Sequence, residues 1–142
     1  MDRDTIEEEQ VEAIRVEQTE NKIFEMINAI SEKRQKQALD LYYDLLTLKE
    51  PPMRILFLIL RQFQKLMLIK ELSGQGADSR TIASKAGMPE FAVRKNQRMA
   101  GNFTMQQIRE AIEDGVDFEE SVKSGRMNDR IAVELLIVKC SQ

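Results

Sequence analysis

Histidine is absent from this 142-residue sequence, and Cys140 is its only cysteine. These absences exclude histidine-ligated metal sites, cysteine clusters, histidine-based catalytic triads and disulfide bonds within one chain. A single cysteine near the C-terminus is typical of a reducing cytosol, where it most often serves as a small apolar residue at the end of a helix. We therefore expect no catalytic group, no metal and no cofactor, and we expect a cytoplasmic protein.

Helix-breaking residues are also scarce, with only three prolines and six glycines. They fall where helices would begin or end, and no segment between them shows the sustained alternation of a β-strand. The most apolar run, residues 55–60, is far shorter than the roughly 20 residues that cross a bilayer. The N-terminus is acidic, unlike a secretory signal. The sequence therefore predicts a single all-α domain that neither enters a membrane nor is exported.

Charge is distributed unevenly along the chain. Residues 1–50 carry 7 basic and 13 acidic side chains, residues 51–110 carry 10 and 4, and residues 111–142 carry 4 and 7. The basic middle segment could face an anionic partner. It could equally pack beside the acidic surfaces of the same chain, and charge patterning alone does not choose between these interpretations.

The sequence predicts two separate helices in the first part of the chain. Thr5 and Glu8 have the spacing of a capping box, which predicts a short polar helix, while Thr19 or the residue after it is placed to begin the next one. We therefore predict an acidic leader or frayed helix over residues 1–18 and a helical domain over residues 19–142.

A long helix should form the centre of the domain. Pro51 and Pro52 predict its start, because proline is tolerated in a first helical turn, and the pattern continues to about Leu72. Its first half is apolar on nearly all sides and needs neighbours all round. We predict a compact bundle of about seven or eight helices around this central helix.

Helix boundaries are also predicted in the second half of the chain. Thr104 and Gln107 form a capping box ahead of a long helix that is expected to pause at Gly115. Asp78 should cap a short helix that runs through Ala86, and Asn128 or Asp129 should cap the last helix. In that helix we expect Ile131, Leu135 and Val138 to face inward. The apolar stripe should be widened by Ala132, Leu136 and Ile137.

The sharpest local motif is TIASKAGMPEFAVRKNQRMA. Ala83, Gly87 and Val93 have the mutual spacing of a helix-turn-helix, and Asn96 and Gln97 could read base edges. Packed helical hairpins share this small-residue corner, and basic side chains are common on exposed faces. Both interpretations stay open for the candidate nucleic-acid contacts Arg94, Lys95 and Arg98.

Across residues 21–139, the order of five segments resembles the C-terminal region of the delta subunit of bacterial DNA polymerase III. The segments are NKIFEMINAIS, QALDLYYDLL, EPPMRILFLILRQFQKLMLIKEL, IASKAGMPEFAVRK and SGRMNDRIAVELLIVK. The resemblance implies an all-helical collar domain of a clamp loader, whose subunits form a ring through such domains and load the sliding clamp onto primed DNA. It implies a polymerase III subunit without a polymerase active site.

The same resemblance implies partners and contact residues. The partners would be other clamp-loader subunits of the gamma/tau and delta-prime type, with non-specific DNA contact and weak self-association as further expectations. The residues implied for the core and for contacts between subunits are Arg61, Gln62, Phe63, Lys65 and Lys139. The family's delta also has an ATPase-like region, so we expect this chain to be a fragment. The alternative function is that of a helix-turn-helix transcriptional regulator.

Overall fold

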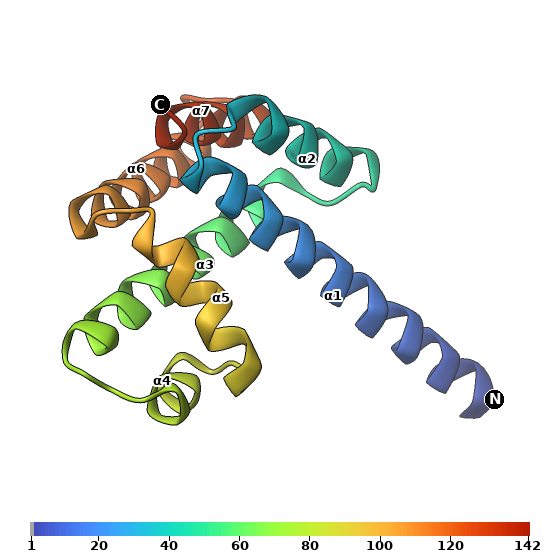
Figure 1. Ribbon diagram of the computed structural model, residues 1–142. Coiled ribbons are helices and arrows are strands. Elements are labelled where there is room, and N and C mark those ends of the chain that lie inside the picture. The colour runs from blue at the N-terminus through green and yellow to red at the C-terminus, as the bar shows by residue number, and fades with distance from the viewer. Residues whose placement is uncertain (1) are drawn as a thin grey trace.

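The computed structural model describes residues 2–142, with side chains described from residue 8 onward, and this part of the chain is entirely helical apart from turns (Figure 1). The all-α prediction is confirmed, and the number of helices agrees with the expected seven or eight. The helices are α1 (Asp2–Ser31), α2 (Gln35–Thr47), α3 (Pro52–Gly74), α4 (Ser79–Ala86), α5 (Glu90–Gly101), α6 (Met105–Lys123) and α7 (Asp129–Cys140).

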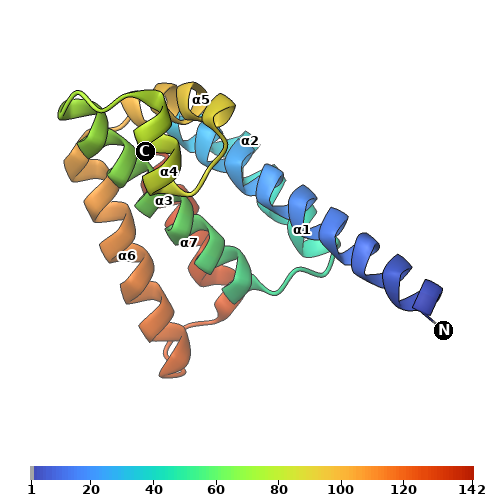
Figure 2. The same ribbon diagram turned by 90° about the horizontal axis from the view of Figure 1, so that it is seen from below.

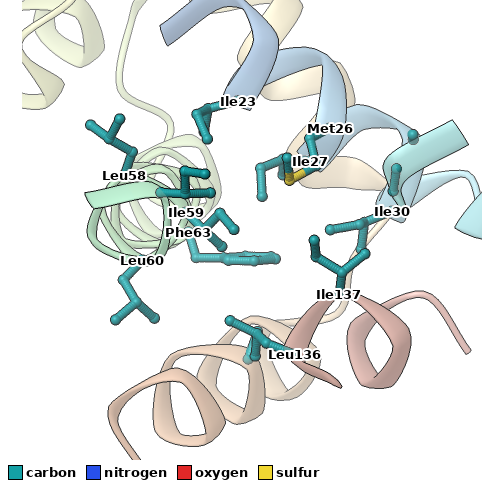
Figure 3. Close-up of a cluster of buried hydrophobic side chains, with 14 of the residues drawn as sticks. Ile23, Met26, Ile27, Ile30, Leu58, Ile59, Leu60, Phe63, Leu136 and Ile137 are labelled. Atoms are coloured by element: carbon teal, nitrogen blue, oxygen red, sulfur yellow. The ribbon is translucent and has the colours of Figure 1, made fainter. Parts of the chain in front are cut away.

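Helix α3 lies at the centre, as its apolar circumference predicts. It packs against α1, α4, α5, α6 and α7. Figure 3 shows its side chains meeting those of α1 on one side and α7 on another. Pro51 caps the helix with an extended backbone and Pro52 occupies its first turn, where a missing N–H removes no helical hydrogen bond. The buried residues of α3 are Ile55, Leu56, Leu58, Ile59, Leu60, Phe63, Leu66, Ile69 and Leu72.

Side-chain caps fix the starts of three helices where the sequence predicts them. Asp78 accepts a hydrogen bond from the Thr81 amide at the start of α4, and Thr104 forms the full capping box with Gln107 at the start of α6. Asn128 accepts from two amides in the first turn of α7. These caps satisfy backbone N–H groups that have no partner within the helix.

The apolar side chains form two clusters. The larger one fills the space between α1, α2, α3, α6, α7 and the C-terminal part of α5. The smaller one joins α4 and the N-terminal part of α5 to the C-terminal part of α3. Figures 1 and 2 show α4 and α5 at one end of α3 and the α2–α7 pair at the other. The α4–α5 pair is therefore a helical hairpin packed on the central helix.

The break expected near residues 17–20 is wrong, because α1 runs unbroken through this region. Thr19 does not cap a new helix. Its hydroxyl donates to the Arg15 carbonyl one turn earlier, at 3.0 Å, and to the Glu50 carboxylate at 3.1 Å. A threonine can therefore satisfy its hydroxyl inside a helix as well as at its start. The division of the chain into a leader and a domain stays a prediction.

The pause expected at Gly115 is also wrong, since α6 is continuous from Met105 to Lys123. Gly115 is buried against α3, and a Cβ at this position would clash with the Leu60 side chain, whose Cγ would be 3.1 Å away. The glycine therefore allows two helices to approach closely instead of interrupting one of them.

The inward stripe expected for α7 is only partly correct: Ala132, Leu136 and Ile137 are buried, but the three residues expected at its centre are not. Ile131 and Leu135 are 50% and 42% exposed, and Val138 is only half-buried. The residues that face the core are Ala132, Val133, Leu136 and Ile137. Because apolar residues surround most of this helix, periodicity alone cannot select the buried side.

Candidate interaction surfaces

Three of the predicted contact residues of α3 lie together on its surface beside α1. Arg61 is exposed, whereas Gln62 and Lys65 are half-buried. They line a small hollow of about 60 Å³ together with Glu20 and other residues of α1 and α3. The pKa of Lys65 is lowered, first because burial disfavours its charged form and then because the Arg61 charge repels it. Glu20 of α1 acts in the opposite direction, because its negative charge favours the charged form of Lys65.

The other two predicted residues lie elsewhere. Phe63 is completely buried and meets the Phe103 ring edge-on, with 5.5 Å between the ring centres, so it belongs to the core and offers no contact surface. Lys139 of α7 is bonded to Asp114 of α6 at 3.0 Å. That carboxylate raises the pKa of Lys139. The structure therefore groups Arg61, Gln62 and Lys65 but separates them from Lys139.

An exposed apolar face on α7 and α2 was not identified as a surface from the sequence. It consists of Ile131 and Leu135 from α7 and Tyr43 from α2, and we call it the α2–α7 face. Tyr43 is 41% exposed. Its hydroxyl donates to the Glu134 carboxylate, which places the ring beside α7. The spacing of Ile131 and Leu135, one turn apart, was the available signal, but it was assigned to the core.

The hydroxyl groups of two tyrosines of α2 attach this helix to α7. The Tyr42 hydroxyl donates to the Arg130 carbonyl at 2.8 Å, and burial raises the pKa of Tyr42 to about 12. The hydrogen bond to Glu134 raises the pKa of Tyr43, because a carboxylate acceptor stabilises the protonated phenol. Both hydroxyls therefore stay protonated at neutral pH and keep the α2–α7 face fixed.

The helix-turn-helix motif forms a packed hairpin instead of a protruding reading helix. In α5, Val93, Asn96 and Met99 are buried against neighbouring helices. Asn96 accepts a hydrogen bond from Gln62 at 2.9 Å and donates to the Ala92 carbonyl, so its amide is engaged inside the bundle. Gln97 donates to the Ser73 hydroxyl. Asn96 is therefore committed to packing, whereas Gln97 is half-buried and its hydrogen bond to Ser73 lies at the surface.

A concave site near the C-terminus has a volume of about 300 Å³ and is lined partly by Glu110, Asp114, Lys139 and Cys140. Burial raises the pKa of Cys140 to about 12, so its thiol is protonated at neutral pH and is a poor nucleophile. Across the side chains that the structure describes, no cluster of three potential metal ligands occurs. No helix in residues 2–142 has the length and apolar content needed to cross a membrane.

Comparisons with known proteins agree with this architecture. Residues 20–140 match the family model described as DNA polymerase III delta subunit, C-terminal domain. The sequence is 29% identical over 138 residues to DNA polymerase III subunit delta of Bacillus subtilis, covering 97% of this chain and 40% of that protein. The solved structure of the Bacillus subtilis DNA clamp loader delta protein superposes with a TM-score of 0.80, at 29% identity, over 87% of this chain and 36% of its own.

These comparisons do not favour the alternative of a helix-turn-helix regulator, and the buried position of Asn96 explains why the local motif was misleading. The chain spans about two fifths of the length of these relatives. Because the family model covers residues 20–140 and the helical fold agrees with it, the chain belongs to the family of C-terminal domains of the DNA polymerase III delta subunit.

Proposed function

We propose that this chain acts in bacterial DNA replication as the collar module of a clamp-loader delta subunit. Its role is to bind neighbouring loader subunits of the gamma/tau and delta-prime type in the cytoplasm, through contacts between helices. The module supplies a fixed position in the ring and no catalytic group of its own. Membership of the family supports this role, as does the Bacillus subtilis relative described as a clamp loader delta protein.

The observation that carries the proposal is the α2–α7 face. Two aliphatic side chains of α7 and one tyrosine ring of α2 are exposed, and the two helices pack against each other. The two helices are held together, because the hydroxyls of Tyr42 and Tyr43 both donate hydrogen bonds to α7. Exposed apolar groups on such a rigid support favour protein contact, since aromatic and aliphatic residues form the centres of interfaces between proteins.

A second surface is proposed on α3, at Arg61, Gln62 and Lys65. Arg61 and Lys65 line one side of a small hollow, so an acidic side chain of a neighbouring subunit would bind there favourably. Lys139, already paired with Asp114, is proposed only as a residue at the edge of an interface. The two surfaces would bind two different neighbours in a ring.

The test measures binding of this chain to the purified collar domains of the other loader subunits by isothermal titration calorimetry. The double variant Ile131→Asp, Leu135→Asp should weaken binding at least tenfold, because two charges would be buried against apolar groups. Moderate salt should change the wild-type affinity little, since the contacts are mainly apolar. Val116→Asp on α6, where the native side chain is 52% exposed, is the matched control.

Unchanged affinity in the double variant would remove the α2–α7 face from the interface. Absence of binding at micromolar concentration by the wild-type chain would contradict the proposed function itself. Sedimentation of the isolated chain should show only weak self-association, and the same double variant should abolish it.

A further inference from the structure

The small hollow between α1 and α3 contains a lysine amine that can be reached from solvent. Lys65 is half-buried and lines the hollow together with Arg61 and Glu20. Among residues 8–142, no carboxylate lies within 4.0 Å of the Lys65 ammonium or of the Arg61 guanidinium. Both cationic groups are therefore available to a molecule that enters the hollow.

Two features of the hollow favour the neutral form of this amine. Ile23 of α1 and Leu58 of α3 supply apolar lining, and Arg61 precedes Lys65 by one helical turn, so the two cations share one face of α3. Desolvation and a neighbouring cation are the two arrangements that make a lysine nucleophilic, because both disfavour the ammonium form. The lowered pKa of Lys65, caused first by burial and then by Arg61, agrees with this geometry.

The reagent class that matches the hollow is a small acyl phosphate. The exposed guanidinium of Arg61 can bind a phosphate through two parallel hydrogen bonds, and it lies about 5–6 Å along the helix from Lys65. The hollow has a volume of about 60 Å³. One water occupies roughly 30 Å³ in the liquid, so the hollow has room for the three heavy atoms of an acetyl group but not for a long acyl chain.

We propose that Lys65 is an acylation site for small acyl phosphates and that its modification weakens binding at the surface formed by Arg61, Gln62 and Lys65. The lone pair of the neutral amine forms a C–N bond with the acyl carbon, the bond from that carbon to the phosphate oxygen breaks, and a proton passes from the nitrogen to the departing phosphate. The effect on binding rests on the proposed function of this surface, because the resulting amide has no charge to attract an acidic side chain.

The experiment incubates the chain with acetyl phosphate and follows the modification of every lysine by peptide mass spectrometry. Lys65 should react about threefold faster, or more, than two internal controls. Lys70 is half-buried on the same helix, but its ammonium donates to the Ala100 carbonyl at 3.3 Å. Lys95 of α5 is exposed, with its ammonium 5.3 Å from the centre of the Phe24 ring.

The Lys95 control also separates the effect of the hollow from that of a neighbouring arginine. Arg94 and Arg98 lie beside Lys95 in the sequence and one turn away on α5, and all three side chains are exposed. A lysine among arginines but without apolar lining should stay largely protonated and react slowly. Equal rates at Lys65, Lys70 and Lys95 would overturn the proposed site.

Two variants test the roles of the neighbouring charges, with the N-hydroxysuccinimide ester of acetate as a second reagent that has no phosphate. Arg61→Gln should slow the reaction of Lys65 with acetyl phosphate more than its reaction with the ester, because only acetyl phosphate is bound by Arg61. Glu20→Gln should accelerate both reactions, since the native carboxylate favours the ammonium form. An equal effect of Arg61→Gln on the two reagents would overturn the recognition of phosphate.

Calorimetry with the collar domains of the other loader subunits tests the effect on binding. Lys65→Gln, which removes the charge as acetylation does, should weaken binding about fivefold, whereas Lys65→Arg should retain the wild-type affinity. Unchanged affinity in Lys65→Gln, with weakened binding in the Ile131→Asp, Leu135→Asp variant, would overturn the effect on binding and leave the collar function intact. The reaction rates are measured without any partner, so the acylation site stands or falls independently of the proposed function.

Discussion

Two helical regions of this molecule are equally regular but are stabilised by different interactions. Residues 8–18 of α1 extend away from the bundle, and every one of them is exposed or, for Val16, half-buried (Figure 2). Helix α3 has nine buried residues and is surrounded by five other helices. We call residues 8–18 the α1 arm. The comparison separates helix formation by local interactions from helix formation by tertiary burial.

The α1 arm depends on its own sequence and on one anchor. Acidic residues are concentrated near the N-terminal end of α1, where they interact favourably with the helix dipole. Local ion pairs add little, since the Glu12–Arg15 pair is 4.0 Å apart and exposed. Isolated helices of this length are only marginally stable in water. The arm should therefore open far more readily than α3, as amide hydrogen exchange would show.

The largest expected loss of stability comes from removing a buried side chain at the centre of α3. Phe63→Ala should destabilise the fold by about 3–5 kcal/mol, because it leaves a cavity among well-packed neighbours. Phe57→Ala in the same helix should change stability much less, since that ring is 57% exposed. Urea unfolding followed by circular dichroism measures both. Equal losses for the two variants would show that burial does not distinguish these positions.

The anchor of the arm is Glu50, in the turn between α2 and α3. Its carboxylate is only 6% exposed and accepts hydrogen bonds from Arg15 at 3.3 Å and from Thr19 at 3.1 Å, with Arg54 at 3.9 Å. Glu50→Ala should destabilise the fold by about 1–3 kcal/mol. It should also accelerate hydrogen exchange in the arm.

Glu12→Ala is the control for this anchor, because it removes only the exposed pair with Arg15. Its effect on stability should be within about 0.5 kcal/mol. If Glu50→Ala left exchange in the arm at the wild-type rate, the arm would not depend on this anchor.

The close approach of α6 to α3 is tested at Gly115. Gly115→Ala should destabilise the fold by about 1 kcal/mol, because the added methyl group meets the Leu60 side chain. Adding Leu60→Ala should remove the steric conflict, so the two changes should be non-additive. Gly101→Ala is the matched control, with no atom near the added methyl group, and should be neutral or slightly stabilising. Additive losses at Gly115 and Leu60 would contradict the close-contact explanation.

Helix boundaries were predictable where the determining interaction is local. Asp78, Thr104 and Asn128 cap their helices through bonds to amides two or three residues away, so a short window of sequence contains the whole interaction. Thr19 has the same chemistry, but its partner Glu50 is 31 residues away. The sequence alone therefore could not distinguish its role inside a long helix from that of a cap.

Surfaces were less predictable than the fold. The whole-chain resemblance correctly indicated the family, and the apolar circumference of α3 correctly indicated its central place. In α7, however, Ile131 and Leu135 are as apolar as the buried Leu136 and Ile137. Which side faces the core depends on how α2, α3 and α6 are arranged around it, and helical periodicity carries no information about that arrangement.

The smallest expected effect concerns the backbone beside the anchor. Lys49 has a φ of +65°, and the amides of Lys49 and Glu50 bond back to Leu46 and Leu45 in the pattern that ends a helix. Glycine adopts this conformation without strain, so Lys49→Gly should stabilise the fold by about 0.5–1 kcal/mol. Lys36→Gly, within α2, should destabilise it by a similar amount. A loss at both positions would mean that the Lys49 side chain itself contributes to holding Glu50, which would extend the anchor of the α1 arm by one residue.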